Sequence, residues 1–205
     1  VTDPTNGKVV SAPQYGGTIT LAVKEEKIGP DAVVAGPSGM VPDAVSEKLG
    51  QANWAIDRDE FDLVGYTILS AITGHLAESW SQPDPLTYIF KIRQGVYWHD
   101  KAPMNGRELT AQDIEYNFHR VLGMGSGFTE RSEWSLVDWA GAQFESITAT
   151  DKWTVVFKLK ELHLGALAAI LDGNIAWIYP PEVIKEHGDV ADWRNLVGTG
   201  PFQLV

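Results

Sequence analysis

The chain has 205 residues and a formal net charge of −11, with 44% hydrophobic and 21% charged residues. This composition is ordinary for a globular protein, and the acidic balance argues against nucleic acid or an anionic membrane surface as a partner, since both require a basic patch. Cysteine is absent, which excludes a disulfide framework, thiolate zinc sites and cysteine nucleophiles.

The first fifteen residues are predicted to form a flexible tether. The sequence opens VTDPTNGKVVSAPQYGG, which is polar, contains Pro and Gly, and lacks an initiating Met. We therefore expect a processed or trimmed N-terminus, with residues 1–15 outside the fold. A strand is predicted at residues 16–23, where Ile19, Leu21 and Val23 alternate with Thr and Ala.

The pattern is weaker between residues 31 and 77. Gly and Pro interrupt the chain up to residue 59, and VPDAVSEKLGQ predicts one short helix that ends at Gly50. The apolar spacing over residues 61–77 favours a helix over a strand.

The segment TYIFKIRQGVYW predicts a strand over residues 87–98. Tyr88, Phe90 and Ile92 lie on one face of this strand, until Gln94 and Gly95 turn the chain.

The clearest helical pattern is LTAQDIEYNFHRVLG. Thr110 is a favourable N-cap, Asp113 three residues later makes a variant of the capping box, and Gly123 suits the left-handed C-terminal cap. The apolar residues at helical spacing are expected to face the core, namely Ile114, Phe118, Val121 and Leu122.

Four further elements are predicted before the C-terminus. FESITATDKWTVVFKLK predicts a hairpin, with strands at 144–150 and 153–159 and a turn at Asp151–Lys152. LGALAAILDG predicts a short apolar helix closed by Gly173, and NIAWIY predicts a short strand. PPEVIKEHGD predicts a helix with Pro181 in its first turn and Gly188 just past its end.

The chain ends in VGTGPFQLV, which we interpret as a turn into a strand at residues 202–205. A phosphate-binding loop is the alternative, but no GxxxxGK motif is present, and Pro201 follows the glycines where a helix would be needed.

No catalytic constellation stands out in the sequence. Ser126 lacks the glycine of a nucleophile elbow two positions before it, and the five histidines never occur as HxxxH or HxH, so we interpret them as exposed or hydrogen-bonded. A glycosidase carboxylate pair stays open, since nothing singles out two of the 27 acidic residues. We expect no catalytic residue, no metal site and no cofactor. An acidic cluster lies at Asp57, Asp59, Glu60 and Asp62. It lacks the features of a calcium loop, so it does not predict a calcium site.

A more specific signal lies in residues 76–122. LAESWSQPDPLTYIFKIRQGVYWHDKAPMNGRELTAQDIEYNFHRVL closely resembles the extracellular solute-binding proteins of family 5, the oligopeptide-, dipeptide- and nickel-type receptors of bacterial ABC importers. The LAESW turn, the strand into IRQGVYWHD and the LTAQDIEYNF helix occur in family order, followed by ITATDKWTVVFKLK, IYPPEVIKEHGD and VGTGPFQLV. The resemblance covers residue 16 to the end, although residues 31–61 match poorly.

The resemblance implies an α/β fold with mixed sheet layers: a type II lobe like that of periplasmic binding proteins, with an inserted smaller α+β domain. Lobe I would combine residues 16–30 with residues 163–205, and residues 31–162 would form the inserted domain. Because family members are longer, the resemblance also implies that the second ligand lobe is absent from this chain. The receptor would close on its ligand by a hinge motion.

In peptide-binding relatives, the loop after the first strand contributes ligand contacts, and it corresponds here to Val23, Lys24, Glu25 and Glu26. Its backbone would pair with an extended peptide, a glutamate would meet a ligand amine and Lys24 a carboxylate, or else these are solvated charges. Phe128 and Trp134 are candidates to face the cleft, with core packing as the alternative.

The sequence thus predicts a non-enzymatic receptor subunit that captures peptides or similar small polar solutes, with ABC permease subunits as partners and no nucleic acid. By resemblance it is exported to the periplasmic or extracellular face of the cell membrane as a lipoprotein, associated with the membrane only through a removed lipid anchor. The alternatives are a secreted hydrolase on a similar scaffold and a non-catalytic interaction domain.

Overall fold

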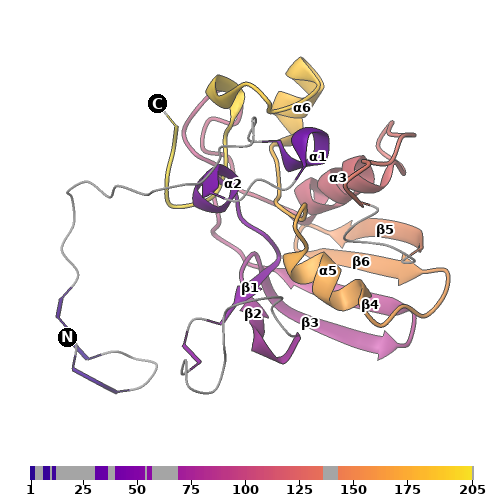
Figure 1. Cartoon of the computed structure of the whole chain (residues 1–205), viewed down its shortest axis with the longest axis horizontal. Helices are drawn as coiled ribbons and strands as arrows, with labels where there is room; N and C mark the ends of the chain where they lie inside the picture. Colours follow the sequence, from indigo (N-terminus) through magenta and orange to yellow (C-terminus); the bar gives the residue numbers. More distant parts are fainter. Residues whose placement is uncertain are drawn as a thin grey trace.

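The computed structural model describes residues 1–2, 7–9, 11–12, 31–36, 40–53, 55–56, 69–135 and 143–204. It shows the predicted mixed α/β fold, in which a four-stranded and a two-stranded antiparallel sheet pack with helices (Figure 1). The predicted strand at 16–23 and the acidic cluster at 57–62 lie outside the described residues. The division into a lobe and an inserted domain stays a prediction.

The larger sheet has the strand order β3-β4-β6-β5. The predicted apolar face of β4 is confirmed, because Tyr88, Phe90 and Ile92 are all buried. The predicted hairpin is confirmed as well, although its turn lies one residue later than expected because Asp151 still pairs with Thr154. The bounds are Ala77–Asp84 for β3, Thr87–Ile92 for β4, Phe144–Asp151 for β5 and Thr154–Leu159 for β6.

Helix α3, at Ala111–Leu122, lies on this sheet and forms the centre of the core (Figure 1). The ring of Phe118 meets that of Phe157 edge to face at a centroid distance of 4.9 Å. Asp113 accepts a hydrogen bond from the backbone N–H of Thr110, and Gly123 is left-handed with φ of 64°. Both predicted caps are thus confirmed, and the amphipathic face buries large side chains that stabilise the helix.

The smaller sheet pairs β1, at Gly50–Ala52, with β2, at Ile72–Gly74, which follows the 3-10 turn η1 at Leu69–Ala71. Helix α5, at Ala166–Asp172, contacts both strands and ends before Gly173, as predicted. The predicted helix over 61–77 is wrong from residue 72 on, because residues 72–74 form β2 and residue 77 begins β3.

Strand β3 also replaces the predicted LAESW turn. It lies at the edge of the sheet, and most of its residues are exposed on both faces, so it lacks the alternation that marks a half-buried strand. Its extended conformation is imposed by pairing with β4, where Trp80 lies opposite Phe90.

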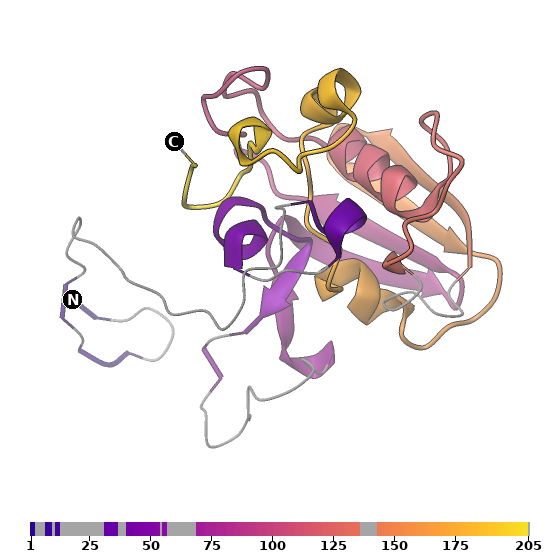
Figure 2. The same cartoon turned by 45° about the horizontal axis from the view of Figure 1, so that its top comes forward.

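Helix α2, at Met40–Val45, is shorter than predicted. The prediction that it continues to Gly50 is wrong, because Gly50 pairs with Gly74 in the smaller sheet. The C-terminal segment lies beside α2 in both Figure 1 and Figure 2. The N–H of Gly200 donates a hydrogen bond to Val45 O at 2.8 Å. These late residues satisfy carbonyls that a longer helix would have used.

The C-terminal strand predicted at 202–205 is also wrong for its described residues. Residues 202–204 form no strand, and Phe202 instead donates its N–H to Ala44 O at 3.2 Å. The glycines permit this close approach, since a Cβ on Gly198 would lie 1.8 Å from Val45 O. The segment therefore packs against α2, which agrees with its interpretation as a structural turn and not as a phosphate-binding loop.

The strand predicted at NIAWIY is wrong, because residues 174–179 form a turn and irregular backbone but no strand. The side chain of Asn117 holds the backbone of this segment: its Nδ2 donates to Trp177 O at 3.1 Å, and its Oδ1 accepts from the N–H of Tyr179 at 3.1 Å. Helix α6, at Pro181–His187, follows with the predicted Pro181 start and Gly188 end, before the 3-10 turn η2 at Trp193–Asn195.

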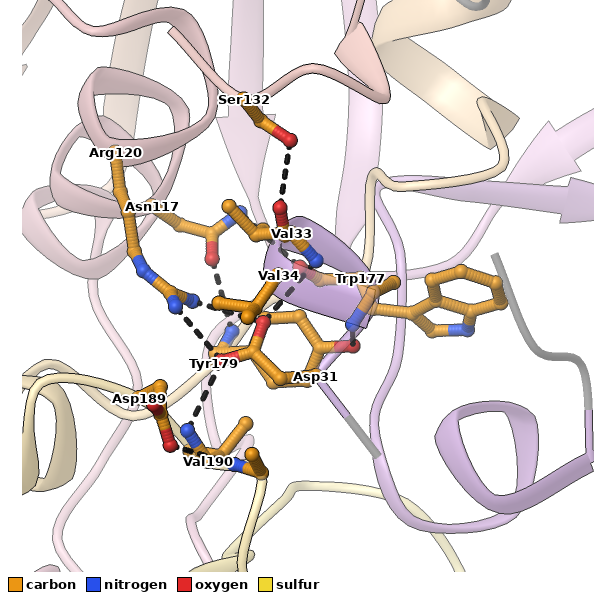
Figure 3. Close-up of polar contacts among 12 residues, drawn as sticks. Asp31, Val33, Val34, Asn117, Arg120, Ser132, Trp177, Tyr179, Asp189 and Val190 are labelled. Atoms are coloured by element: carbon orange, nitrogen blue, oxygen red, sulfur yellow. Dashed lines mark hydrogen bonds and ion pairs between the residues drawn. The ribbon is translucent and has the colours of Figure 1, made fainter. Parts of the chain in front are cut away.

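A buried ion pair connects α1, at Ala32–Ala35, to α3 (Figure 3). Arg120 Nη2 lies 2.7 Å from Asp31 Oδ2, and the side chain of Asp31 has no exposed surface. The same carboxylate accepts from the N–H of Val33 and the N–H of Val190. Each hydrogen bond helps to compensate the cost of removing the carboxylate from water.

A second ion pair connects the entry of α3 to α6 and predicts a pH-dependent stability. Arg107 Nε lies 2.6 Å from Glu182 Oε1. Burial would raise the pKa of Glu182, but the hydrogen bonds and charge of Arg107 outweigh it and lower that pKa. The stabilisation from this ion pair is therefore fully present above the pKa that Glu182 has in the unfolded chain. It is lost as the pH falls through the lower pKa that Glu182 has in the folded protein.

We therefore expect Glu182→Gln to lower the free energy of unfolding by about 0.5–1 kcal/mol at neutral pH, the size of a partly exposed ion pair. The difference should shrink as the pH falls below 4.5, the ordinary value for this group. Urea unfolding at neutral and acid pH measures it, with Glu186→Gln, whose side chain is 60% exposed, as the control. A difference that did not change with pH would contradict the expectation.

Candidate functional site

A pocket of about 430 Å³ lies where the end of α2 meets β1, the end of α5 and Trp177. Ionisable side chains make up half of its lining residues. The polar and charged lining side chains that carry its chemistry are Asp43, Ser46, Glu47, Lys48, His75 and Asp172.

One ion pair in the pocket joins α5 to the segment after α2. Lys48 Nζ lies 3.0 Å from Asp172 Oδ1 and 4.3 Å from the centre of the Trp177 ring. The ammonium group is therefore held between a carboxylate and an aromatic face, and both interactions are favourable. The charges of Lys48 and Asp172 compensate each other.

A second pair links Glu47 to the turn before β3. His75 Nε2 lies 2.7 Å from Glu47 Oε1. Burial would raise the pKa of Glu47, but the hydrogen bond and charge of His75 outweigh it and lower that pKa. Glu47 is therefore ionised at neutral pH, and its negative charge is directed at the imidazole.

Asp43 differs from the other two carboxylates. It accepts a hydrogen bond from Trp177 Nε1 at 2.9 Å, and it forms no ion pair among the described residues. Partial burial is the largest influence and raises the pKa of Asp43 above its ordinary value, against the opposing charge of Lys48. Next to it, Ser46 is 2% exposed, and its Oγ has no hydrogen-bond partner in the described structure.

The buried network of Figure 3 sets the position of the Trp177 ring. The backbone of Trp177 and Tyr179 is held by Asn117 of α3, while Tyr179 Oη accepts from the N–H of Ala32. In Figure 3 the indole ring of Trp177 points away from this network. The rigid core thus holds the backbone and presents the ring to the pocket.

The aromatic residues predicted to face a cleft lie elsewhere and do not line this pocket. Phe128 meets the ring of Tyr116 edge to face at 5.2 Å. Trp134 Nε1 donates to Val34 O at 3.4 Å, with its ring against Gly36. Their role in ligand contact stays a prediction, as does that of Val23, Lys24, Glu25 and Glu26, which lie outside the described residues.

The predicted interpretation of the histidines is confirmed at four positions, including the exposed His187, but not at His163, whose buried Nδ1 has no hydrogen-bond partner in the described structure. His75 pairs with Glu47, His99 Nε2 lies 2.8 Å from Gly200 O, and His119 Nε2 lies 2.9 Å from Ile147 O. Among the residues that the structure describes, no group of three or more His, Cys, Asp and Glu side chains is arranged to hold a metal ion. Likewise, none of the described helices has the length and apolar character needed to cross a membrane.

Comparison with known proteins identifies relatives by sequence. The family described as bacterial extracellular solute-binding proteins, family 5 Middle, matches residues 71–205. The dipeptide-binding protein of Escherichia coli is 30% identical over 143 residues, covering 63% of this chain and 26% of the relative. The probable D,D-dipeptide-binding periplasmic protein DdpA of the same organism is 29% identical over 138 residues, covering 65% and 24%. The chain thus spans about a quarter of the length of the curated relatives it matches.

Solved structures show the same fold. The periplasmic binding protein DppA from Helicobacter pylori, in complex with the peptide STSA, has a TM-score of 0.66 at 23% identity, covering 88% of this chain and 35% of that one. NikZ from Campylobacter jejuni, in complex with Ni(L-His), has a TM-score of 0.58 at 19% identity, covering 89% and 32%. With a family match over most of its length, the chain belongs to the bacterial extracellular solute-binding proteins of family 5.

Proposed function

We propose that this protein is the solute-binding receptor of an ABC importer and captures peptides or similar small polar solutes for uptake. The observation that carries the proposal is the family match over residues 71–205. Two of the curated relatives are dipeptide-binding proteins by name, and the DppA structure holds a peptide. On this proposal the protein binds and releases its solute unchanged and has no catalytic residue.

The proposal places the receptor outside the cytoplasmic membrane, where ABC permease subunits are its partners. The relatives named as periplasmic support the location. Attachment through a lipid anchor is part of the same proposal and rests on the family resemblance.

The pocket at Trp177 is the part of the solute site that we propose from the structure. Its polar lining and aromatic ring suit a small polar ligand, because a few placed polar groups orient a ligand while a ring supplies contact area. Peptides fit this description, since they combine charged ends with a hydrogen-bonding backbone.

Isothermal titration calorimetry with dipeptides, tripeptides, a monosaccharide and a nickel–histidine chelate tests the proposal. Saturable heat from peptides alone is the expected result. Trp177→Phe removes the N–H that holds the Asp43 carboxylate in place, so this side chain must be ordered on binding, and peptide binding should weaken about fivefold, the effect of roughly 1 kcal/mol of side-chain ordering. Trp193→Phe on the 44% exposed η2 ring is the matched control and should leave binding unchanged. Heat from the sugar or the chelate, with none from peptides, would overturn the peptide assignment.

A further inference from the structure

We propose that Asp43, Ser46 and the ring edge of Trp177 form a seat for a cationic nitrogen group, an ammonium or guanidinium, of the captured solute. This inference rests on the proposed function and assigns the chemistry of one part of the ligand. It depends on bonding capacity that the protein leaves unused in the pocket.

Ser46 has the clearest unused capacity. It is 2% exposed and lines the pocket, yet its Oγ has no hydrogen-bond partner in the part of the chain that the structure describes. Buried hydroxyl groups nearly always have a partner in folded proteins, because leaving one unpaired is costly. A hydroxyl in this position can accept a hydrogen bond from a ligand N–H.

Asp43 supplies the negative charge. The other two carboxylates of the pocket face partners, Glu47 with His75 and Asp172 with Lys48. Asp43 accepts only the neutral indole N–H, at Oδ1, so its other oxygen, Oδ2, has no donor among the described residues. A cation at this oxygen would add a direct counter-charge, which the burial that raises the pKa of Asp43 makes more favourable for the ionised form.

The geometry brings these two groups together. Asp43 lies in α2, and Ser46 follows three residues later with its N–H bonded to Pro42 O, so the helical path continues to it. Residues three apart on a helical path share one face. The hydrogen bond from Trp177 fixes the indole ring at the same carboxylate.

The charges of the lining groups favour a cation over an anion. The pocket lining has three carboxylates, which outnumber its cationic groups even when His75 is protonated alongside Lys48, so the pocket is negative. The charge of Lys48 is already compensated by Asp172, which makes it a weaker partner for a ligand carboxylate. The same pair shows that the Trp177 ring accepts an ammonium group, since Lys48 lies 4.3 Å from its centre.

Nuclear magnetic resonance of the indole N–H of Trp177 tests the seat, with the signal assigned by its loss in Trp177→Phe. The probes are n-propylammonium, methylguanidinium, neutral 1-butanol and anionic propionate. We expect saturable shifts with both cations and none with the other two probes. Asp43→Asn should weaken cation binding at least tenfold and Ser46→Ala about threefold. Asp100→Asn, at an exposed carboxylate outside the pocket, should have no effect.

Thermal unfolding of each variant establishes that it is folded before its binding is compared. Equal shifts with butanol and propylammonium, or cation binding that survives Asp43→Asn unchanged, would overturn the seat. If peptides give calorimetric heat while neither cation shifts the indole signal, the seat is wrong and the receptor proposal stands. If the cations bind through Asp43 while no solute class gives heat, the seat is supported and the receptor proposal fails.

Discussion

Replacing Arg120 by Met should lower the free energy of unfolding by about 3–5 kcal/mol, the largest effect we expect from a single substitution in this chain. The variant leaves the carboxylate of Asp31 buried without a counter-charge, since its side chain has no exposed surface. The N–H groups of Val33 and Val190 would still donate to Asp31, but two neutral donors do not compensate a full charge in a site shielded from water. Chemical denaturation at neutral pH measures the loss.

The exposed ion pair of η2 is the matched control. Arg194 lies 3.2 Å from Asp192, with side chains 69% and 48% exposed, so Arg194→Met should change stability by at most about 1 kcal/mol. The double variant Asp31→Leu/Arg120→Met should be more stable than Arg120→Met alone, because it removes the uncompensated charge. A cost below about 1 kcal/mol for Arg120→Met would show that water reaches Asp31.

Replacing Gly198 by Ala should cost about 3 kcal/mol of unfolding free energy, at the upper end of the range for overpacking. The added Cβ would lie 1.8 Å from Val45 O, and a backbone carbonyl cannot rotate away as a side chain can. The C-terminal segment would have to move off α2, which would break the hydrogen bond from Gly200 N–H to Val45 O. Because α2 carries Asp43, the shift should also weaken ligand binding at the pocket.

Gly165→Ala is the control for this substitution. A Cβ there would meet only the side chain of His163, at 3.3 Å, so we expect a change within about 0.5 kcal/mol. Hydrogen exchange at the Gly200 amide reports the contact directly, and it should accelerate in Gly198→Ala alone. Unchanged exchange together with wild-type stability would mean that the C-terminal segment does not depend on this close approach.

Several elements could be predicted from the sequence because their signals are local. Helix α3 carries its two caps, at Thr110 and Gly123, and its apolar stripe within one short stretch, and its bounds agree with the prediction. The alternation of β6 likewise marks a strand with one buried face, with Phe157 at its centre. The family resemblance depends on the same segments in order, and the match over residues 71–205 confirms it.

The candidate site could not be predicted in this way. Asp43, His75 and the neighbouring Asp172 and Trp177 come from three separate segments, and no known motif joins them. The chain contains eight tryptophans, and nothing in the sequence distinguishes Trp177 from the other seven. The hydroxyl of Ser46, which has no partner among the residues that the structure describes, can be recognised only from its neighbours in space.

The sequence by itself determined the family and the helices and strands whose caps and apolar spacing lie within a few residues. Only the tertiary structure decided the end of α2, the edge strand β3 and the pocket. The physical reason is the same in each case: the hydrogen-bond partners come from distant parts of the chain. Val45 O finds its donor at Gly200, β3 becomes extended by pairing with β4, and the Trp177 ring reaches Asp43 because Asn117 holds its backbone.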